Sequence, residues 1–131
     1  MSVTHSASAL NAATDAVTAL IGTGAHLKFH ITGSTVGTPS TTVATLTMTS
    51  NANGGFGAAA AGVATAGTIT SDTNAAGGTV AFASIQTSGN VAIIHCAVAA
   101  SASDINMTNG LVVASGDTVA CSSLTYKAIP A

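Results

Sequence analysis

The chain has 131 residues, which is enough for one domain with a buried core and too few for two. Only 5% of the residues are charged and the sole lysine or arginine residues are Lys28 and Lys127, so the chain cannot neutralise the several phosphates on which nucleic-acid affinity depends. It has no run of about eighteen apolar residues of the kind that crosses a bilayer, so neither nucleic acid nor a membrane is an expected partner.

The first predicted element is an amphipathic helix over residues 6–21. Ser6 or Ser8 can cap its start, and Gly22 can end it. Its apolar positions recur at helical spacing, namely Leu10, Ala13 or Thr14, Val17 and Ile21.

The rest of the chain is predicted to be a β domain over residues 25–131, following the helical segment 1–24. Short segments with strand character alternate with turn residues, and nothing helical separates them, which excludes a parallel α/β fold. This pattern is typical of a mainly β protein, an antiparallel β-sandwich or jelly-roll-like domain with one N-terminal α-helix. The predicted strands cover residues 26–32, 41–50, 62–66, 68–70, 79–86, 91–99, 105–107, 111–114 and 118–127.

His95 and Cys96 are adjacent within the apolar run 91–99 and raise the question of a nucleophile beside its base. Successive side chains of a strand leave opposite faces, so these two cannot come within the hydrogen-bond reach of about 3 Å that a catalytic pair needs. We expect Cys96 to be a small buried hydrophobe and His95 to lie on the other face. The four aspartates stand singly, three of them at predicted turns. The sequence therefore predicts no enzyme activity.

Neither a metal site nor a cofactor site is predicted. His26 and His30 lie four apart in a predicted strand, about 13 Å from each other, which is too far for two ligands of one zinc ion. The segment 104–110 is similar to part of a calcium loop but lacks the closing glutamate. Cys96 and Cys121 could meet across the sheet in a disulfide, but we expect free thiols in a reducing compartment.

Four apolar residues are candidates for contact with a partner. Phe56 is the one large apolar side chain in the Asn- and Gly-rich loop 51–57, and it must either tuck under the domain or meet a partner. Leu10, Val17 and Ile21 make the helix a lid if they pack on the chain's own sheet, and an interface if they are exposed.

A series of short motifs follows the first helix in chain order, namely Leu27, Phe29 and Gly33, Ala44 to Leu46, Gly78 to Ala81, Asp104 to Asn106, and Gly116 to Val119. These motifs resemble those of a family of small virion structural proteins of tailed bacteriophages, and the likeness covers nearly the whole chain. The chain departs from the family pattern at residues 30–31, where an aromatic residue is frequent, and at residues 85–86, where a charged turn is common.

The resemblance implies a non-enzymatic virion protein, most closely a capsid decoration or cement protein. Such a protein is made in the cytoplasm of the host bacterium, and the N-terminus shows no secretory signal. The implied partners are the major capsid protein and further copies of the chain, and a trimer would suit the threefold positions of a capsid. The low charge also favours association.

Two alternatives stay open. The first is a tail- or fibre-associated component of the same kind of particle, which differs in its place and not in its chemistry. The second is a carbohydrate-binding adhesin module. Sugar sites commonly present aromatic faces, and the chain offers only Tyr126 and three phenylalanines for that purpose.

Overall fold

The computed structural model describes residues 3–31, 39 and 41–129, and this part of the chain is mainly β with one helix near the N-terminus. The predicted fold class is confirmed at this level. Gly33 of the family motif lies outside the described residues. In chain order the elements are α1 (Ala7–Ile21), β1 (His26–Ile31), β2 (Thr42–Met48), β3 (Val63–Thr65), β4 (Ile69–Thr70), β5 (Gly78–Gln86), β6 (Ala92–Ala99), β7 (Ile105–Asn106), β8 (Val112–Val113) and β9 (Thr125–Lys127).

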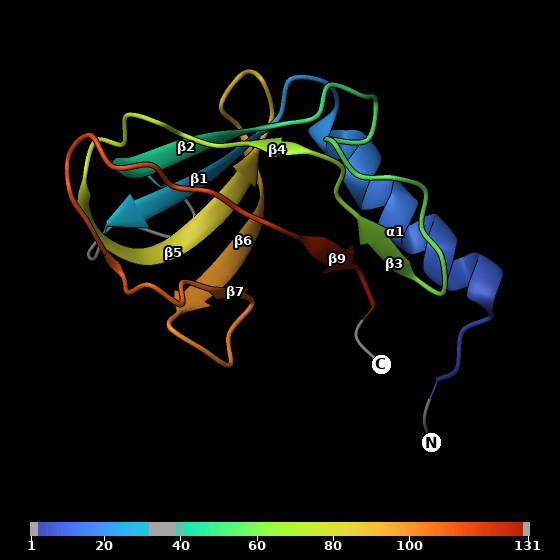
Figure 1. Cartoon of the computed structure of the whole chain (residues 1–131). Helices are drawn as coiled ribbons and strands as arrows, with labels where there is room; N and C mark the ends of the chain where they lie inside the picture. Colours follow the sequence, from blue (N-terminus) through green and yellow to red (C-terminus); the bar gives the residue numbers. More distant parts are fainter. Residues whose placement is uncertain (1–2, 32–38, 40, 130–131) are drawn as a thin grey trace.

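One curled sheet forms the body of the molecule. Its strands follow the order β4-β2-β1-β5-β6-β7, and β8 pairs with the start of β5. The pairs are antiparallel except for β6 with β7, which is parallel. A separate two-stranded sheet, β3 with β9, lies beside α1 at one end (Figure 1). The antiparallel sandwich is thus realised only in part, because a short strand pair and loops stand where a second full sheet was expected.

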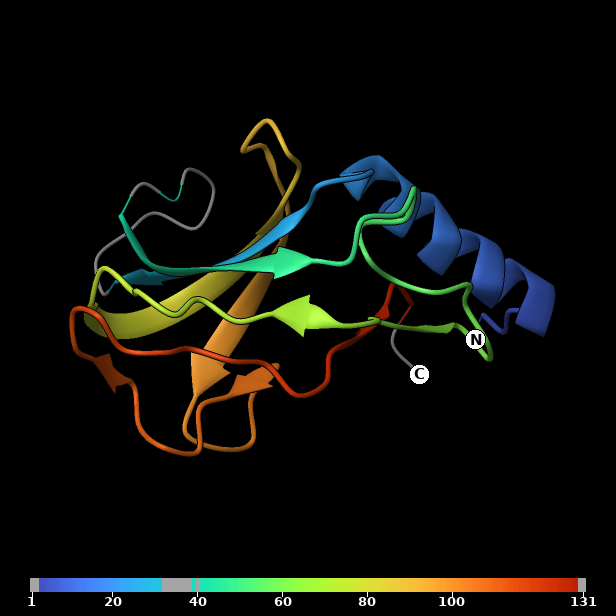
Figure 2. The same ribbon diagram turned by 45° about the horizontal axis from the view of Figure 1, so that its top comes forward.

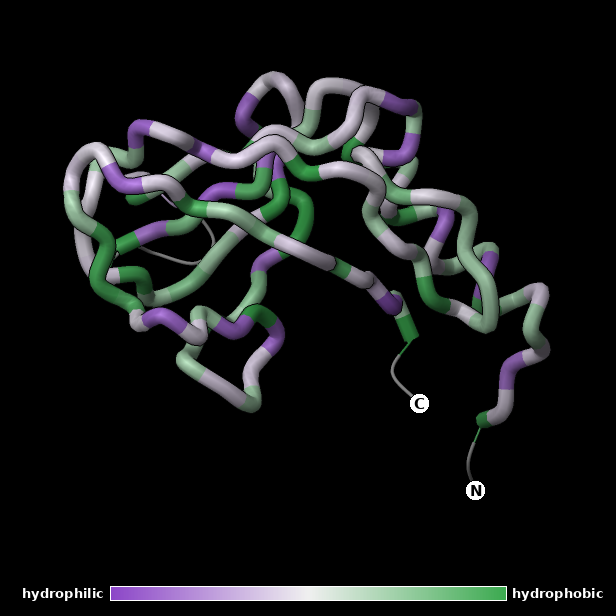
Figure 3. The backbone as a smooth tube through the Cα atoms, in the orientation of Figure 1, coloured by the Kyte–Doolittle hydropathy of each residue, from purple (hydrophilic) through white to green (hydrophobic). Residues whose placement is uncertain are grey.

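The hydrophobic core lies between the inner face of the curled sheet and the segments that cross it (Figure 2). Leu27, Phe29 and Leu46 form the sheet side of this core and are at most 2% exposed. Figure 3 shows hydrophobic stretches along the strands, whereas strongly hydrophilic residues are scattered singly or in short groups. Residues from outside the sheet complete the core, among them Ile21, Phe56, Ala75, Val119 and Leu124.

Two irregularities in strand pairing flank His30 on β1. The register with β2 shifts between Phe29 and His30, and the register with β5 shifts between His30 and Ile31. Such bulges bend a strand, increase its twist and redirect side chains. His30 is only 1% exposed, although strict alternation puts it on the less buried face of β1.

The limits of α1 agree with the sequence prediction. Ser6 caps the helix, and its Oγ accepts a hydrogen bond from the N–H of Ala9 at 3.2 Å. Gly22 follows the last turn with a φ of 71°, a backbone conformation that glycine adopts without a steric penalty.

The inward face of α1 differs from the predicted apolar stripe. Thr14 and Ile21, which the predicted stripe includes, are buried, and so is Thr18, which it does not include, whereas Leu10 and Val17 are only half-buried. A count of apolar residues passes over buried threonines, yet threonine is stable in a core when its hydroxyl has a partner. Here each of the two hydroxyls donates a hydrogen bond to a backbone carbonyl.

Three side chains attach α1 to the loop that precedes β3. Asn11 Oδ1 accepts the N–H of Gly62 at 2.8 Å, and Thr14 Oγ1 donates to the carbonyl of Gly62 at 2.6 Å. Asp15 Oδ1 accepts the N–H of Ala59 at 2.9 Å. The polar residues of α1 therefore bind the helix to the β part of the chain.

The last predicted strand, residues 118–127, is confirmed only at its end, where β9 pairs with β3. Earlier in this segment Val119 forms an isolated bridge with Asp72, and the carbonyl of Leu124 accepts the N–H of Ala66 at 2.9 Å. The segment changes partners as it crosses the molecule, so no continuous ladder forms before residue 125.

Candidate functional site

Polar side chains gather on one face of the curled sheet, and we call the six that come from β1, β5 and β6 the polar face. Lys28 of β1 lies opposite Ser84 of β5, and Ser84 lies opposite His95 of β6. Directly opposed residues of an antiparallel pair share a face. His26 is likewise opposite Gln86. With His30, which bonds to Ser84, the polar face consists of His26, Lys28, His30, Ser84, Gln86 and His95.

A chain of hydrogen bonds at the centre of the polar face joins β1 to β5. His30 Nε2 is 2.7 Å from Ser84 Oγ, and Gln86 Nε2 donates to the same Oγ at 2.9 Å. His30 Nδ1 is 3.3 Å from the carbonyl oxygen of Thr41. Because a carbonyl only accepts, we assign the proton of the neutral ring to Nδ1, so Nε2 accepts the proton of the Ser84 hydroxyl. Both ring nitrogens and the hydroxyl are then satisfied.

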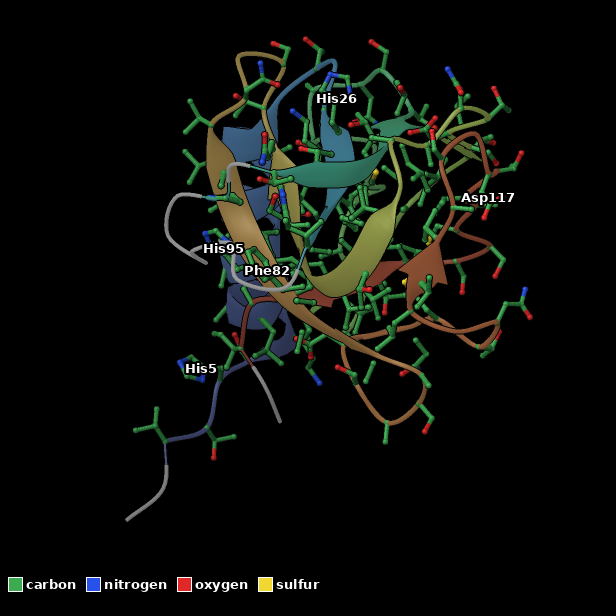
Figure 4. All side chains as sticks on the ribbon, turned by 90° about the vertical axis from the view of Figure 1, so that its left-hand side faces the viewer. His5, His26, Phe82, His95 and Asp117 are labelled. Carbon is green, nitrogen blue, oxygen red and sulfur yellow. The ribbon has the colours of Figure 1, made fainter. Side chains whose placement is uncertain are left out.

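The surroundings of His30 favour its neutral form. Burial lowers the pKa of His30, and the charges of Lys28 and His95 lower it further against the opposing effect of the bond to Thr41. Burial and Lys28 also lower the pKa of His26, whose Nδ1 is buried without a hydrogen-bond partner in the described part of the chain. In Figure 4, Asp117 lies on the other side of the molecule from His95 and Phe82. Its carboxylate therefore does not offset the positive charge of Lys28 near His30.

A histidine nitrogen 2.7 Å from a serine hydroxyl is also the first requirement of a nucleophilic serine site. Ser84 is 0% exposed and His30 is 1% exposed, so a substrate has no path to the hydroxyl in this conformation. The second ring nitrogen bonds to a backbone carbonyl, where hydrolases of this kind use a carboxylate. The arrangement can hold two strands together and can take up a proton, but it lacks the access that acyl transfer needs.

Sequence reasoning did not identify the pair formed by His30 and Ser84. The two residues are 54 positions apart in the chain. Alternation within each strand indicates which residues share a face, but the register between strands decides which of them meet. The bulges beside His30 change that register locally, and a single sequence gives no signal for them.

His95 and Cys96 lie on opposite faces of β6, as predicted. His95 is exposed, whereas Cys96 packs against the core. Burial raises the pKa of the Cys96 thiol to about 11, with a further contribution from Asp104, and burial also raises the pKa of Cys121. Both cysteines are free, which agrees with the expected thiols. A thiol that stays protonated near neutral pH is a poor nucleophile.

Each of the four aspartates has a structural role. The predicted role as turn residues is confirmed for Asp117, which accepts the N–H of Ala114 three residues earlier, and for Asp72, whose Oδ1 accepts the N–H of Asn74 at 2.9 Å. Asp104 instead accepts the N–H of Ala97 on β6, seven residues earlier. No group of three or more histidine, cysteine or aspartate side chains in the described residues is arranged to hold a metal ion. The carboxylates each accept a backbone N–H at 2.9 Å, in the pairs Asp15 with Ala59, Asp72 with Thr45, Asp104 with Ala97, and Asp117 with Ala114.

Two of the four candidate contact residues belong to the core. Ile21 is 2% exposed and Phe56 is 1% exposed, so neither can touch a partner while the chain keeps this fold. Phe56 takes the first of its two expected roles and packs edge-on against Tyr126, with 6.4 Å between the ring centroids. Their assignment to an interface is therefore corrected to the core. Leu10 and Val17 are half-buried and keep part of their surface available.

The solvent side of α1, which we call the outer face of α1, carries no charged side chain. Leu20 is 68% exposed, and the single charged residue of the helix, Asp15, is half-buried and bound to the N–H of Ala59. Sequence reasoning missed Leu20 because it lies off the predicted stripe. The exposed apolar residues of the outer face are Ala9, Ala12, Ala16, Ala19 and Leu20.

A groove of about 600 Å³ lies between residues 104–113 and 117–125. Phe29 forms part of its floor but is 2% exposed, so the ring offers almost no stacking surface. Asp104 and Asp117 line the groove, and each has one carboxylate oxygen in a bond to backbone N–H. The groove is therefore polar, with side chains held in place by the backbone.

No helix in the described part of the chain is long and apolar enough to cross a membrane. Comparisons of the chain with protein-family models, with curated proteins and with solved structures give no match. The function must therefore be inferred from the chemistry of the chain's own surfaces.

Proposed function

We propose that this chain is a non-enzymatic structural protein of a tailed-phage virion, and that within the virion it is a capsid decoration protein. The observation that carries the proposal is the uncharged outer face of α1, in which Leu20 is 68% exposed. The inward side of α1 is already packed on the chain through Thr14, Thr18 and Ile21, and exposed apolar residues on the opposite side mark an interaction surface. In a decoration protein the outer face of α1 would rest on the major capsid protein.

The placement of the polar side chains supports a structural role. The aspartates hold loops, and the bonds among His30, Ser84 and Gln86 lie in the interior. Each of these groups strengthens the fold.

Binding of many copies to one capsid would allow each copy to use a small contact area. The outer face of a 15-residue helix buries less surface than the roughly 800 Å² per partner of a standard stable interface. A protein held at many equivalent positions, and in contact with further copies of itself, gains from multivalency. A formal net charge of −2 keeps the repulsion between neighbouring copies low.

The experiment that tests the proposal is quantitative mass spectrometry of purified particles of the encoding phage, with copies of this chain counted per copy of the major shell protein. A ratio near one, or near a simple fraction of one, is expected. A handful of copies would place the chain in the tail or a fibre, which is the first alternative. Absence from the particle would overturn the virion assignment.

A pair of variants tests the surface. Leu20→Glu puts a charge on the outer face of α1, and Val112→Glu puts the same charge on a residue of β8 that is 77% exposed. Binding of each purified variant to particles stripped of this chain is measured by co-sedimentation. We expect Leu20→Glu to lose binding and Val112→Glu to keep it, whereas equal binding by both would exclude the outer face of α1 as the contact.

The groove beside residues 117–125 favours a second candidate, the carbohydrate-binding module. Asp104 and Asp117 each keep one oxygen outside the backbone bonds, and fixed carboxylates and hydroxyls suit the hydroxyls of a neutral sugar. Against it stands the buried ring of Phe29. An array of neutral glycans decides the matter: binding that Asp117→Asn abolishes supports the sugar site, and no binding to any glycan ends it.

A further inference from the structure

We propose that the hydrogen bonds among His30, Ser84 and Gln86 form an acid-released latch between β1 and β5. Neutral His30 closes the latch near neutral pH, and protonation of His30 opens it. The proposal rests on the geometry of the polar face and holds whether or not the chain belongs to a virion.

The latch fits only one protonation state of His30. In the neutral ring Nε2 accepts the Ser84 hydroxyl proton, and Ser84 Oγ in turn accepts from Gln86 at 2.9 Å. A protonated ring has N–H groups on both nitrogens, so Nε2 can no longer accept. The hydroxyl of Ser84 then loses its acceptor at a position that is 0% exposed. A buried donor without a partner is strongly unfavourable.

Among the described residues, the titratable groups that face His30 disfavour a positive charge on its ring, and the bond from Nδ1 to the Thr41 carbonyl is what favours one. On its own strand the titratable neighbours are His26 and Lys28, and the register places Thr42 of β2 opposite it. From β6 the titratable neighbour is His95. All three titratable neighbours are basic.

The strand β5 supplies only uncharged neighbours. Ser84 and Gln86 form the hydrogen bonds, and the Phe82 ring lies against the imidazole with 5.1 Å between centroids and 32° between planes. A proton taken up by His30 would therefore sit in a buried and already basic environment, which opposes the closed state.

Opening would act on a part of the sheet that is already irregular. His30 lies between two shifts in register, one toward β2 and one toward β5. The ladder at such points holds fewer regular backbone bonds, so side-chain bonds contribute more of the local attachment. Because β1 lies between β2 and β5, loss of the bond between His30 and Ser84 would weaken the attachment of β1 to β5 at this end of the strand.

The direction of the pH effect follows from the lowered pKa values of His30 and His26. Below about pH 6.5 the unfolded chain binds more protons at these positions than the folded chain does. The contribution of these two histidines to the free energy of unfolding is therefore fully present above about pH 6.5. It is lost progressively as the pH falls toward their lowered pKa values in the folded chain.

The test compares thermal unfolding of three full-length proteins between pH 7 and pH 5. His30→Gln keeps an acceptor near Ser84 but cannot titrate, and His95→Gln removes one exposed histidine from the same face. We expect the Tm of the wild type to fall by about 3 °C or more over this range. His95→Gln should keep most of that fall, and His30→Gln should lose a large part of it. An equal fall in the two variants would overturn the latch.

A direct titration keeps the proposal testable if His30→Gln does not fold. Nitrogen-15 NMR of the wild-type imidazoles reports the tautomer and the pKa of each histidine. We expect the neutral ring of His30 to carry its proton on Nδ1 and the pKa of His30 to lie below the ordinary histidine value of about 6.5. Amide exchange in β1 and β5, corrected for intrinsic rates, should accelerate over the same pH range. A pKa of His30 at or above that ordinary value, or unchanged exchange in both strands, would overturn the proposal.

Discussion

The hydroxyl of Thr14 forms two hydrogen bonds: it donates to the carbonyl oxygen of Gly62 at 2.6 Å, and its Oγ1 accepts the N–H of Ala128 at 3.2 Å. One hydroxyl thus joins the helix to the loop before β3 and to the chain after β9. Thr14 is 0% exposed, so water cannot replace either bond without a change in the packing.

Replacing this hydroxyl should cost stability. Thr14→Val keeps the shape of the side chain but leaves the carbonyl of Gly62 and the N–H of Ala128 without their partner, and we expect a loss of about 1–3 kcal/mol in the free energy of unfolding. Thr18→Val is the matched control, because Thr18 is also 0% exposed but donates only within the helix, to the carbonyl of Asp15 at 3.2 Å. Urea denaturation measures both, and equal losses would show that the long-range bonds of Thr14 contribute nothing special.

The close approach of Gly54 to Ile21 should be as important for the free energy of unfolding as the hydrogen bonds of Thr14. Gly54 has a φ of 66°, and a Cβ there would lie 2.6 Å from the Cβ of Ile21. Gly54→Ala is expected to lower the free energy of unfolding by about 1–3 kcal/mol, because either the helix end or the loop must move. In the same loop, a Cβ on Gly57 would meet nothing closer than the Thr65 carbonyl at 3.6 Å, so Gly57→Ala should change stability by no more than about 0.5 kcal/mol. Thermal denaturation of the two variants compares them directly, and a neutral Gly54→Ala would contradict the tight contact with Ile21.

The fold class follows from the sequence because it depends on local signals. The strands β5 and β6 were predicted from two β-rich runs, and they pair antiparallel as the predicted fold class requires. The helix was predicted from its spacing and from Ser6, which does cap it. These features depend on neighbours in the chain, so one sequence is enough to find them.

The polar face and the buried face of α1 depend on partners that are distant in the sequence. The pair His30 and Ser84 requires a register that two bulges modify, and bulges leave no compositional signal in β1. Thr18 is buried although the apolar periodicity does not include it, and its hydroxyl, like that of Thr14, has a backbone carbonyl within reach. The sequence of its loop allows Phe56 to belong either to the core or to an interface. Only the tertiary structure shows that it belongs to the core.

Substitutions can distinguish the core position of Phe56 from the surface position of Leu20. Phe56→Ala removes a ring that is 1% exposed and packs against Tyr126, so we expect a loss of about 3–5 kcal/mol in the free energy of unfolding. Leu20→Ala removes a side chain that is 68% exposed, so the stability should change by no more than about 0.5 kcal/mol. Chemical denaturation measures both variants. If Leu20→Ala proved as destabilising as Phe56→Ala, Leu20 would be part of the packing and not a free surface residue.

The reactivity of Cys96 offers a prediction with a defined pH dependence. Burial and, to a smaller extent, Asp104 raise the pKa of its thiol to about 11, so close to neutral pH almost all of it is protonated. The thiolate is the reactive form, and its fraction changes about tenfold per pH unit below the pKa. Alkylation of native Cys96 by iodoacetamide should therefore be slow at pH 7 and should accelerate about tenfold for each unit up to pH 10.

A Cys121→Ser variant isolates this thiol, and intact-mass spectrometry follows the alkylation over time. The same protein unfolded in urea is the control, because its thiol is free of burial and should reach a rate plateau at a lower pH. Restricted access alone would slow the native reaction by a constant factor and leave the plateau at the same pH as in the unfolded chain. A native plateau displaced to higher pH is thus the specific result expected from burial of the thiol, and coincident plateaus would contradict it.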